Sequence, residues 1–171
     1  MSTTKWTIDP THSEVSFKVK HLVISTVTGN FNVFEGYAET PNGDFKGAKI
    51  EFSADINSIN TNQADRDTHL KSEDFFNSEK HPQLKFTNGV LEGDVLRGDL
   101  TIKDVTKPIE LEVEFGGIAD DPYGNTKAGF ELLGKISRKE FGLTWSPVTE
   151  AGSVVVGDQI KLLASVQLVK N

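Results

Sequence analysis

Apolar and polar residues alternate along most of this chain, and this alternation limits its fold more than any other feature. From Val15 to Val19 the odd positions are apolar and the even positions are polar. From Ile109 to Phe115 the same period sets apolar residues against glutamates. A period of two places successive side chains on opposite faces of a β-strand. Strands of this kind indicate an antiparallel sheet that hides its apolar face.

The alternation continues beyond these two segments, interrupted by turn signals. It predicts further strands over residues 5–8, 29–38, 49–56, 84–86, 95–102, 128–136 and 160–168. A change of parity within residues 29–38, where Phe31 and Val33 are followed by Phe34, predicts a β-bulge. Asn88–Gly89 is interpreted as a turn and Gly116–Gly117 as part of a loop.

Two architectures satisfy this pattern, a sandwich and a closed barrel. Several strands span about eight to ten residues, roughly 27–34 Å. Small residues recur on the inner face, at Gly36, Ala54, Gly98, Gly134 and Ala164. These features favour a barrel with interior space, and eight strands enclose just enough room for one small ligand. We therefore expect an all-β fold, an elongated eight-stranded antiparallel barrel capped by a short helical insertion at about residues 62–76.

The stretch from Ser58 to Phe86 departs from the alternation. Residues 63–71 contain no Gly or Pro, which predicts a short helix with Asn62 as its N-cap. The helix is polar on most of its surface and therefore cannot be buried on all sides. We expect it to cover an opening or edge of the sheet, held there by Leu70 and the Phe75–Phe76 pair.

Composition limits the function further. The 171 residues suit one domain, residues 1–171, with its own core. The absence of cysteine removes disulfides, thiolate chemistry and Cys-ligated zinc. A net charge of −7 argues against nucleic acid and against adsorption to anionic membranes. No apolar run approaches the ~20 residues of a membrane span, so no stable membrane insertion is expected.

The N-terminal residues, MSTTKWTIDP, lack the basic and apolar regions of a secretory signal. This predicts a cytoplasmic protein, or a periplasmic one if a leader has been removed.

The histidines and the acidic residues of the insertion are the candidates for chemistry. Asp65 and His69 lie four positions apart on the expected helix, which would let a carboxylate orient an imidazole for acid–base catalysis or fasten the helix to the barrel. His21 continues an apolar face, so it needs a hydrogen-bond partner or a place at the mouth of a pocket. The histidines show no short ligand spacing and no phosphate-binding glycine motif occurs. No metal or other cofactor is expected.

Several short motifs are spread over nearly the whole chain. They are Trp6-x-Ile8-Asp9, His12-Ser13-x-Val15-x-Phe17-x-Val19-x-His21-Leu22, Gly29-x-Phe31-x-x-Phe34-x-Gly36, Ser58-Ile59-x-Thr61, Arg66-Asp67-x-His69-Leu70, Asp74-Phe75-Phe76, Pro82, Phe86, Gly98-Asp99-Leu100-Thr101-Ile102, Thr106-Lys107-Pro108 and Arg138-x-x-Phe141-Gly142-Leu143. Together they resemble the YceI-like family of polyisoprenoid-binding barrel proteins. Asp104 and Ser137 depart from the family pattern, and both fall in expected turns.

The resemblance implies a lipocalin-like barrel and a non-catalytic role. Its hydrophobic tunnel would hold a long isoprenoid chain, such as a polyprenyl phosphate or an isoprenoid quinone, for transport or storage, in some members during a stress response. An apolar chain gains roughly 0.8 kcal/mol per buried CH₂, so a long tail needs no strong polar contact.

The residues expected to line or close the tunnel come from the inward strand positions and the cap. They are Phe17, Val19, Leu22, Phe31, Phe34, Phe52, Ile56, Leu70, Phe75, Phe76, Phe86, Leu100, Ile102, Phe130, Leu132 and Phe141. His21, Arg66 and His69 are the candidates for holding the polar head group or fixing the cap.

Two other functions stay open. The chain could be a lipid-modifying hydrolase or isomerase that uses Asp65 and His69, or a packed structural or interaction domain without a ligand. A homodimer formed through edge strands is also open.

Overall fold

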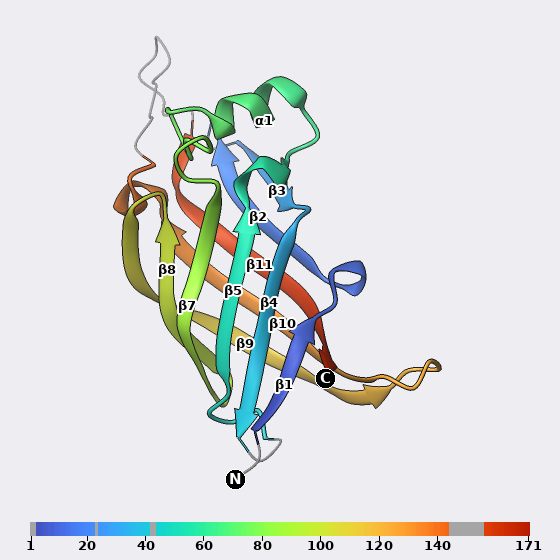
Figure 1. The fold of residues 1–171 in the computed structure, drawn as a ribbon. Coiled ribbons are helices and arrows are strands. Elements are labelled where there is room, and N and C mark those ends of the chain that lie inside the picture. Colours follow the sequence, from blue (N-terminus) through green and yellow to red (C-terminus); the bar gives the residue numbers. More distant parts are fainter. Residues whose placement is uncertain (1–2, 23, 42–43, 144–155) are drawn as a thin grey trace.

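The computed structural model describes residues 3–22, 24–41, 44–143 and 156–171 (Figure 1). Strands are labelled β, 3₁₀ helices η and the α-helix α1. The elements in chain order are β1 (Thr3–Ile8), η1 (Pro10–His12), β2 (Glu14–His21), β3 (Ser25–Phe31), β4 (Phe34–Pro41), β5 (Lys49–Asp55), η2 (Ile56–Ser58), β6 (Ile59–Asn60), α1 (Ala64–Lys71), β7 (Gln83–Glu92), β8 (Val95–Ile102), β9 (Val105–Asp120), β10 (Thr126–Ser137), η3 (Arg138–Phe141) and β11 (Val156–Lys170). The α-helix among them is too short and too polar to cross a membrane, and no other helix of the described residues could do so.

Eight strands form a closed antiparallel ring. Their order is β1, β4, β5, β7, β8, β9, β10 and β11, and β11 closes the ring by pairing with β1. This confirms the predicted eight-stranded barrel with one short helix. Figure 1 shows α1 over one end of an elongated barrel, which we call the capped end. We call the opposite end, where β4 turns into β5 through residues 44–48, the base.

Strand β11 has two partners along one edge. It pairs with β1 near the base, at Leu168 to Lys170, and with β2 farther up, at Val156 to Ser165. β2 in turn pairs with β3, and β3 with the short β6. At the changeover the Asp9 N–H donates to the Gln167 carbonyl at 2.8 Å, and the Gln167 N–H donates to Ser13 Oγ at 3.0 Å. These bonds satisfy the backbone where β1 ends and β2 begins.

The prediction of one bulged strand over residues 29–38 is wrong. The chain forms two strands here, β3 paired with β2 and β6, and β4 paired with β1 and β5. The change of parity marks the passage of the chain between these two parts of the sheet. Val33 lies at this passage and is 54% exposed instead of facing inward.

The two glycine signals predicted as a turn and a loop are also wrong, because both lie inside strands. Asn88 and Gly89 belong to β7, which shifts register at this point against both β5 and β8. Asn88 has a left-handed φ of 55°, and Gly117 within β9 has a φ of 106°. The irregular conformations that these residues tolerate produce bulges here, not chain reversals.

The predicted helix is present, but its N-cap is Gln63 and not Asn62. The Gln63 side chain accepts a hydrogen bond from the Arg66 N–H at 2.6 Å, whereas Asn62 has a left-handed φ of 65°. No residue of α1 is buried, as its polar surface predicts.

The core consists of two groups of buried side chains. The base cluster comprises Trp6, Ile8, Ala38, Phe45, Ala48, Phe86, Leu91, Leu96, Val113, Ala128, Phe130 and Leu168. The cap cluster comprises Phe17, Phe31, Ala54, Ile56, Ile59, Phe75, Phe76, Leu100, Ile102, Ile136, Phe141 and Leu143. Half-buried Phe34, Phe52 and Ile109 pack against both clusters and link them.

Candidate functional site

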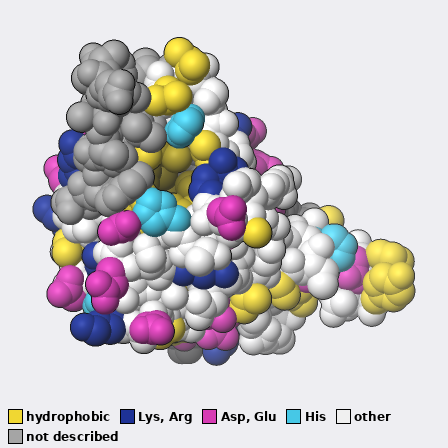
Figure 2. All heavy atoms as spheres, turned by 90° about the horizontal axis from the view of Figure 1, so that it is seen from above, with side chains coloured by type: hydrophobic (Ala, Val, Ile, Leu, Met, Phe, Trp, Pro, Cys, Tyr) yellow, Lys and Arg dark blue, Asp and Glu magenta, His cyan; other side chains and the backbone are white. Residues whose placement is uncertain are grey.

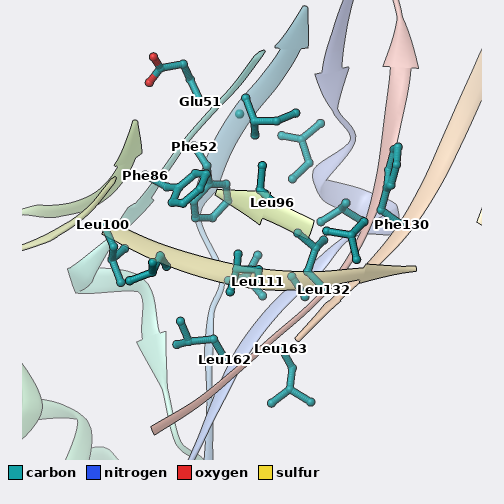
Figure 3. A pocket seen from close by; sticks show the side chains of 18 of the residues that line it. Glu51, Phe52, Phe86, Leu96, Leu100, Leu111, Phe130, Leu132, Leu162 and Leu163 are labelled. Atoms are coloured by element: carbon teal, nitrogen blue, oxygen red, sulfur yellow. The ribbon is translucent and has the colours of Figure 1, made fainter. Parts of the chain in front are cut away.

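A cavity of about 190 Å³ lies inside the barrel, bordered by members of both clusters. Its wall is almost wholly apolar. Figure 3 shows Phe52, Phe86, Leu111 and Leu132 converging on it from different strands. Glu51 also borders the cavity, but Figure 3 shows its carboxylate directed away from the apolar side chains. The interior therefore suits a ligand without charge.

Half of the residues predicted for the tunnel line this cavity. They are Phe17, Phe31, Phe52, Phe86, Leu100, Ile102, Phe130 and Leu132. All lie on strands of the sheet, at inward positions of the two-residue period.

The structure places the other predicted residues outside the cavity wall. Ile56, Phe75, Phe76 and Phe141 are buried in the cap cluster, and Leu70 packs against it. Phe34 is half-buried with its ring 6.0 Å from that of Phe52.

The remaining two lie towards the end of β2. Val19 pairs with Val27 and Ile160 in the sheet, and Leu22 occupies the turn after β2 with a left-handed φ of 52°.

Sequence reasoning missed several residues of the wall. Among them are Ile8, Val15, Ile50, Leu84, Leu91, Leu96, Ile109, Leu111, Val113, Leu162, Ala164, Val166 and Leu168. Most are inward positions on strands that the alternation identified, so taking every inward position as lining would have found them.

Aromatic rings pack closely at the base. The ring of Phe45 lies 4.9 Å from that of Trp6 and 5.0 Å from that of Phe130. The Trp6 indole N–H donates to Thr40 Oγ1 at 3.2 Å, so the buried polar atom is satisfied. This packing closes the cavity at the base.

The capped end is hollowed. Figure 2 looks onto this end and shows hydrophobic side chains within a hollow, with histidine and basic side chains beside it. Below it Phe31 packs against both Phe17, at 5.7 Å between ring centroids, and Phe76, at 6.3 Å edge-to-face. The apolar interior thus approaches the surface at the capped end.

Glycines let two large side chains lie flat against the wall. A Cβ on Gly98 would stand 2.4 Å from Phe86 Cζ, and a Cβ on Gly134 would stand 2.2 Å from Leu111 Cδ2. At these two positions the space predicted for a ligand is taken by the Phe86 and Leu111 side chains.

Arg66 fixes the start of the cap. Its guanidinium donates from Nε to Thr61 Oγ1 at 2.8 Å and from Nη2 to the Thr61 carbonyl at 2.6 Å. Asp67 accepts from the Thr61 N–H at 2.8 Å and from its hydroxyl at 2.5 Å. Of the two roles predicted for Arg66, these bonds describe the structural one.

The carboxylate found against His69 is that of Asp74 and not that of Asp65. His69 Nε2 lies 2.8 Å from Asp74 Oδ2, and the His69 ring packs edge-on against Phe75 at 5.1 Å. The pairing predicted from the helical spacing is therefore corrected. His21 ends β2, half-buried, and its carbonyl accepts from the Ser25 hydroxyl at 3.3 Å.

Arg138 joins the two chain segments next to η3. Its guanidinium donates to the carbonyls of Leu143 at 2.6 Å, Gly157 at 2.8 Å and Val156 at 3.2 Å. Burial lowers the pKa of Arg138, and the Ser137 hydroxyl lowers the pKa of nearby Asp158. Both groups keep their charge at neutral pH.

A second charged group surrounds Asp9, where β1 ends. The Lys127 ammonium donates to Asp9 Oδ2 at 2.8 Å, and His12 Nδ1 lies 2.8 Å from the same oxygen. The Lys127 ammonium and the Thr11 hydroxyl hold the pKa of the Asp9 carboxyl well below its usual range. This cluster ties the end of β1 to β10 across the intervening strand β11, outside the cavity.

The fold and the cavity together define an antiparallel β-barrel of lipocalin-like architecture with an apolar interior. The chain belongs to the YceI-like family, since the model of the YceI-like domain matches residues 6–168. A UPF0312 protein of Staphylococcus aureus (strain USA300) is 37% identical over 166 residues, which cover 96% of each chain.

Solved structures show the same barrel. A Campylobacter jejuni YCEI protein superposes with a TM-score of 0.71 at 33% identity, over 89% of this chain and 90% of that one. A polyisoprenoid binding domain from Saccharophagus degradans superposes with a TM-score of 0.72 at 15% identity, over 97% of this chain and 98% of that one.

Proposed function

We propose that this protein binds a long-chain isoprenoid lipid inside the barrel, for transport or storage, and performs no chemistry on it. The observation that carries the proposal is the apolar cavity, closed at the base by aromatic packing. Burial of an isoprenoid chain there removes apolar surface from water, at about 25 cal/mol per Å². No cofactor takes part.

The size of the cavity means that side chains must move before a long lipid can bind. At about 190 Å³ it is smaller than the ~300 Å³ at which ligand pockets commonly begin. A long chain would therefore have to widen the cavity by shifting side chains that border it, such as Phe52 and Leu132. The head group, a quinone or a phosphate, would stay at the capped end, because the base is closed.

The Saccharophagus degradans domain supports the same class of ligand. It is described as polyisoprenoid-binding and shares this fold, and the S. aureus and C. jejuni relatives share the family. A role in a stress response, which the resemblance implies, would be one setting for such a carrier.

Filling the cavity tests the proposal. Leu100 lines the cavity and is 6% exposed, so Leu100→Trp places additional atoms in the interior. We expect uptake of a fluorescent polyprenyl probe to fall at least about tenfold in a variant that remains folded by circular dichroism. The matched control is Leu133→Trp, because Leu133 is 40% exposed on the outer face of β10. Unchanged uptake by Leu100→Trp, or equal loss in both variants, would contradict binding in the cavity.

A further inference from the structure

The β2–β3 hairpin differs in charge from the rest of the chain. Residues 15–34 contain no Asp or Glu, although the chain has 25 acidic residues in 171 and a net charge of −7. The hairpin instead carries Lys18 and Lys20, both exposed on the outer face of β2. A local positive surface on a negative protein indicates a partner that is itself negative.

The positive surface continues across the neighbouring strands. Lys18 pairs with Lys161 of β11, and Lys161 pairs with Lys135 of β10, so three exposed lysines stand in one cross-strand row. No ion pair among the described residues includes any of the three. Like charges directly opposite each other destabilise a sheet. Fold stability does not account for the pairing of Lys18 with Lys161, whereas Lys135 also shares a surface hollow with the acidic Glu110, Glu140 and Asp158.

An exposed apolar residue lies at the tip of the same hairpin. Ile24 is 85% exposed in the turn after β2, and Leu22, two positions earlier in the chain, is half-buried. Figure 1 shows β2 pointing towards the capped end, so this tip lies at the end where the hollow opens. Apolar residues flanked by lysines match the boundary between acyl chains and anionic head groups.

We propose that the tip of the β2–β3 hairpin and the lysine row form a docking surface for an anionic lipid bilayer. Ile24 enters the head-group region while Lys18, Lys20 and Lys161 contact phosphate groups. Charges are screened over roughly 8–10 Å at physiological salt, so the lysines act at contact, and the net negative charge of the chain keeps the binding weak and reversible. The whole-chain charge alone had argued against such a contact.

The docking surface extends the proposed function. Its use to the protein depends on that function, because docking brings the lipid-binding barrel to the bilayer. A barrel held by this hairpin presents its capped end to the bilayer, where an isoprenoid lipid resides. Vesicle binding without any isoprenoid lipid tests docking separately from lipid uptake, so either function can fail alone.

The first experiment compares two charge reversals of equal size. Binding is measured to phosphatidylglycerol–phosphatidylcholine vesicles and to phosphatidylcholine vesicles, both free of isoprenoid lipid. We expect preference for the anionic vesicles, and a loss of about tenfold or more in Lys18→Glu/Lys161→Glu. Lys46→Glu/Lys49→Glu, with exposed lysines at the base, has the same net charge and should retain most of the binding. Equal binding to both vesicle types, no binding, or equal loss in both variants would overturn the proposal.

The second experiment locates the contact. Because the chain has no cysteine, Ile24→Cys creates a single site for a polarity-sensitive fluorophore. We expect its emission to shift to the blue on addition of anionic vesicles. Tyr123→Cys, at an 87% exposed position in the β9–β10 turn, should show no shift. A shift at Tyr123 and none at Ile24 would place the contact elsewhere and overturn the proposal.

Discussion

Single residues decide how much free space the barrel retains. The Phe86 ring lies over Gly98 and Gly89, at distances that leave no room for a Cβ on either. The ring therefore lies against the wall instead of projecting across the interior. Interiors packed this closely respond to the addition of one methyl group.

The first prediction concerns Gly98→Ala. The new Cβ would stand 2.4 Å from Phe86 Cζ and 3.0 Å from Gly89 Cα, so the ring must move into the cavity. We expect a loss of about 1–3 kcal/mol in the free energy of unfolding in urea, and weaker uptake of polyprenyl lipid. Gly129→Ala is the control, because a Cβ there has no atom within 4 Å. Equal stability of the two variants would contradict this account of the wall.

The second prediction concerns Arg138, which is 2% exposed and donates to three backbone carbonyls. Arg138→Lys keeps the charge but loses the planar donor geometry and leaves carbonyls unpaired. We expect thermal or chemical denaturation to show a loss of about 2–4 kcal/mol. The exposed neighbour Lys139→Ala should change stability by less than about 0.5 kcal/mol. An Arg138→Lys variant as stable as the parent would show that these hydrogen bonds contribute little to the free energy of unfolding.

At the scale of elements, residue period predicted more than local turn signals did. The limits of β2 agree with the alternation from Glu14 to His21, because the period reports which face is buried. Asn88–Gly89 failed as a turn signal, since the same left-handed conformation serves a turn or a bulge. Whether these residues form a turn or a bulge depends on the pairing of β7 with β5 and β8. The N-cap differed by one residue for the same kind of reason, because Asn62 adopts the left-handed conformation.

The residues of the candidate site were predictable where they lie on alternating strands, and less so in the cap. Phe17, Phe52 and Leu100 line the cavity because inward strand positions must face the interior. The sequence predicted Phe75 and Phe76 both as the anchor of the cap and as tunnel residues, and the structure buries both in the cap cluster. It could not separate these two roles, since the outcome depends on how the residues after α1 fold back. It also could not separate Asp65 from Asp74 as the partner of His69, because Asp74 lies beyond the end of the helix.

The third prediction concerns the ion pair of Asp9, at the end of β1, with Lys127 of β10. The pKa of Asp9 is lowered in the folded state, chiefly by Lys127, so its contribution to stability is present above the unfolded pKa of about 3.9. That contribution is lost as the pH falls through the lowered folded-state pKa. We expect Asp9→Asn to cost about 1–3 kcal/mol at pH 7, and this difference from the parent should shrink progressively below about pH 5.

Two features of the same measurement check this assignment. Lys127→Met should make stability depend less on pH, as Asp9→Asn does, because it removes the main cause of the lowered pKa of Asp9. Both variants should keep some acid sensitivity, since the pKa values of Asp121 and Asp158 are also lowered. A difference between Asp9→Asn and the parent that stays constant from pH 7 to pH 2 would contradict this role for Asp9.

At the scale of the whole molecule, the barrel has two unlike ends. The base is filled by Trp6, Phe45 and Phe130, whereas the capped end is hollowed and carries α1 and the β2–β3 hairpin. The apolar cavity lies between them and offers no charged group to a ligand. This arrangement suits a long apolar molecule that enters by one end and is shielded from water along its length.

Mass spectrometry of the gently purified protein tests this account most directly. The account predicts a stoichiometric apolar adduct under native conditions, which stays bound until the protein unfolds and which solvent extraction identifies as an isoprenoid lipid. Protein that carries no adduct should take up an added polyprenyl lipid or isoprenoid quinone at one molecule per chain. A clean apo mass that persists after incubation with these lipids would contradict the lipid-binding barrel and favour a packed structural domain.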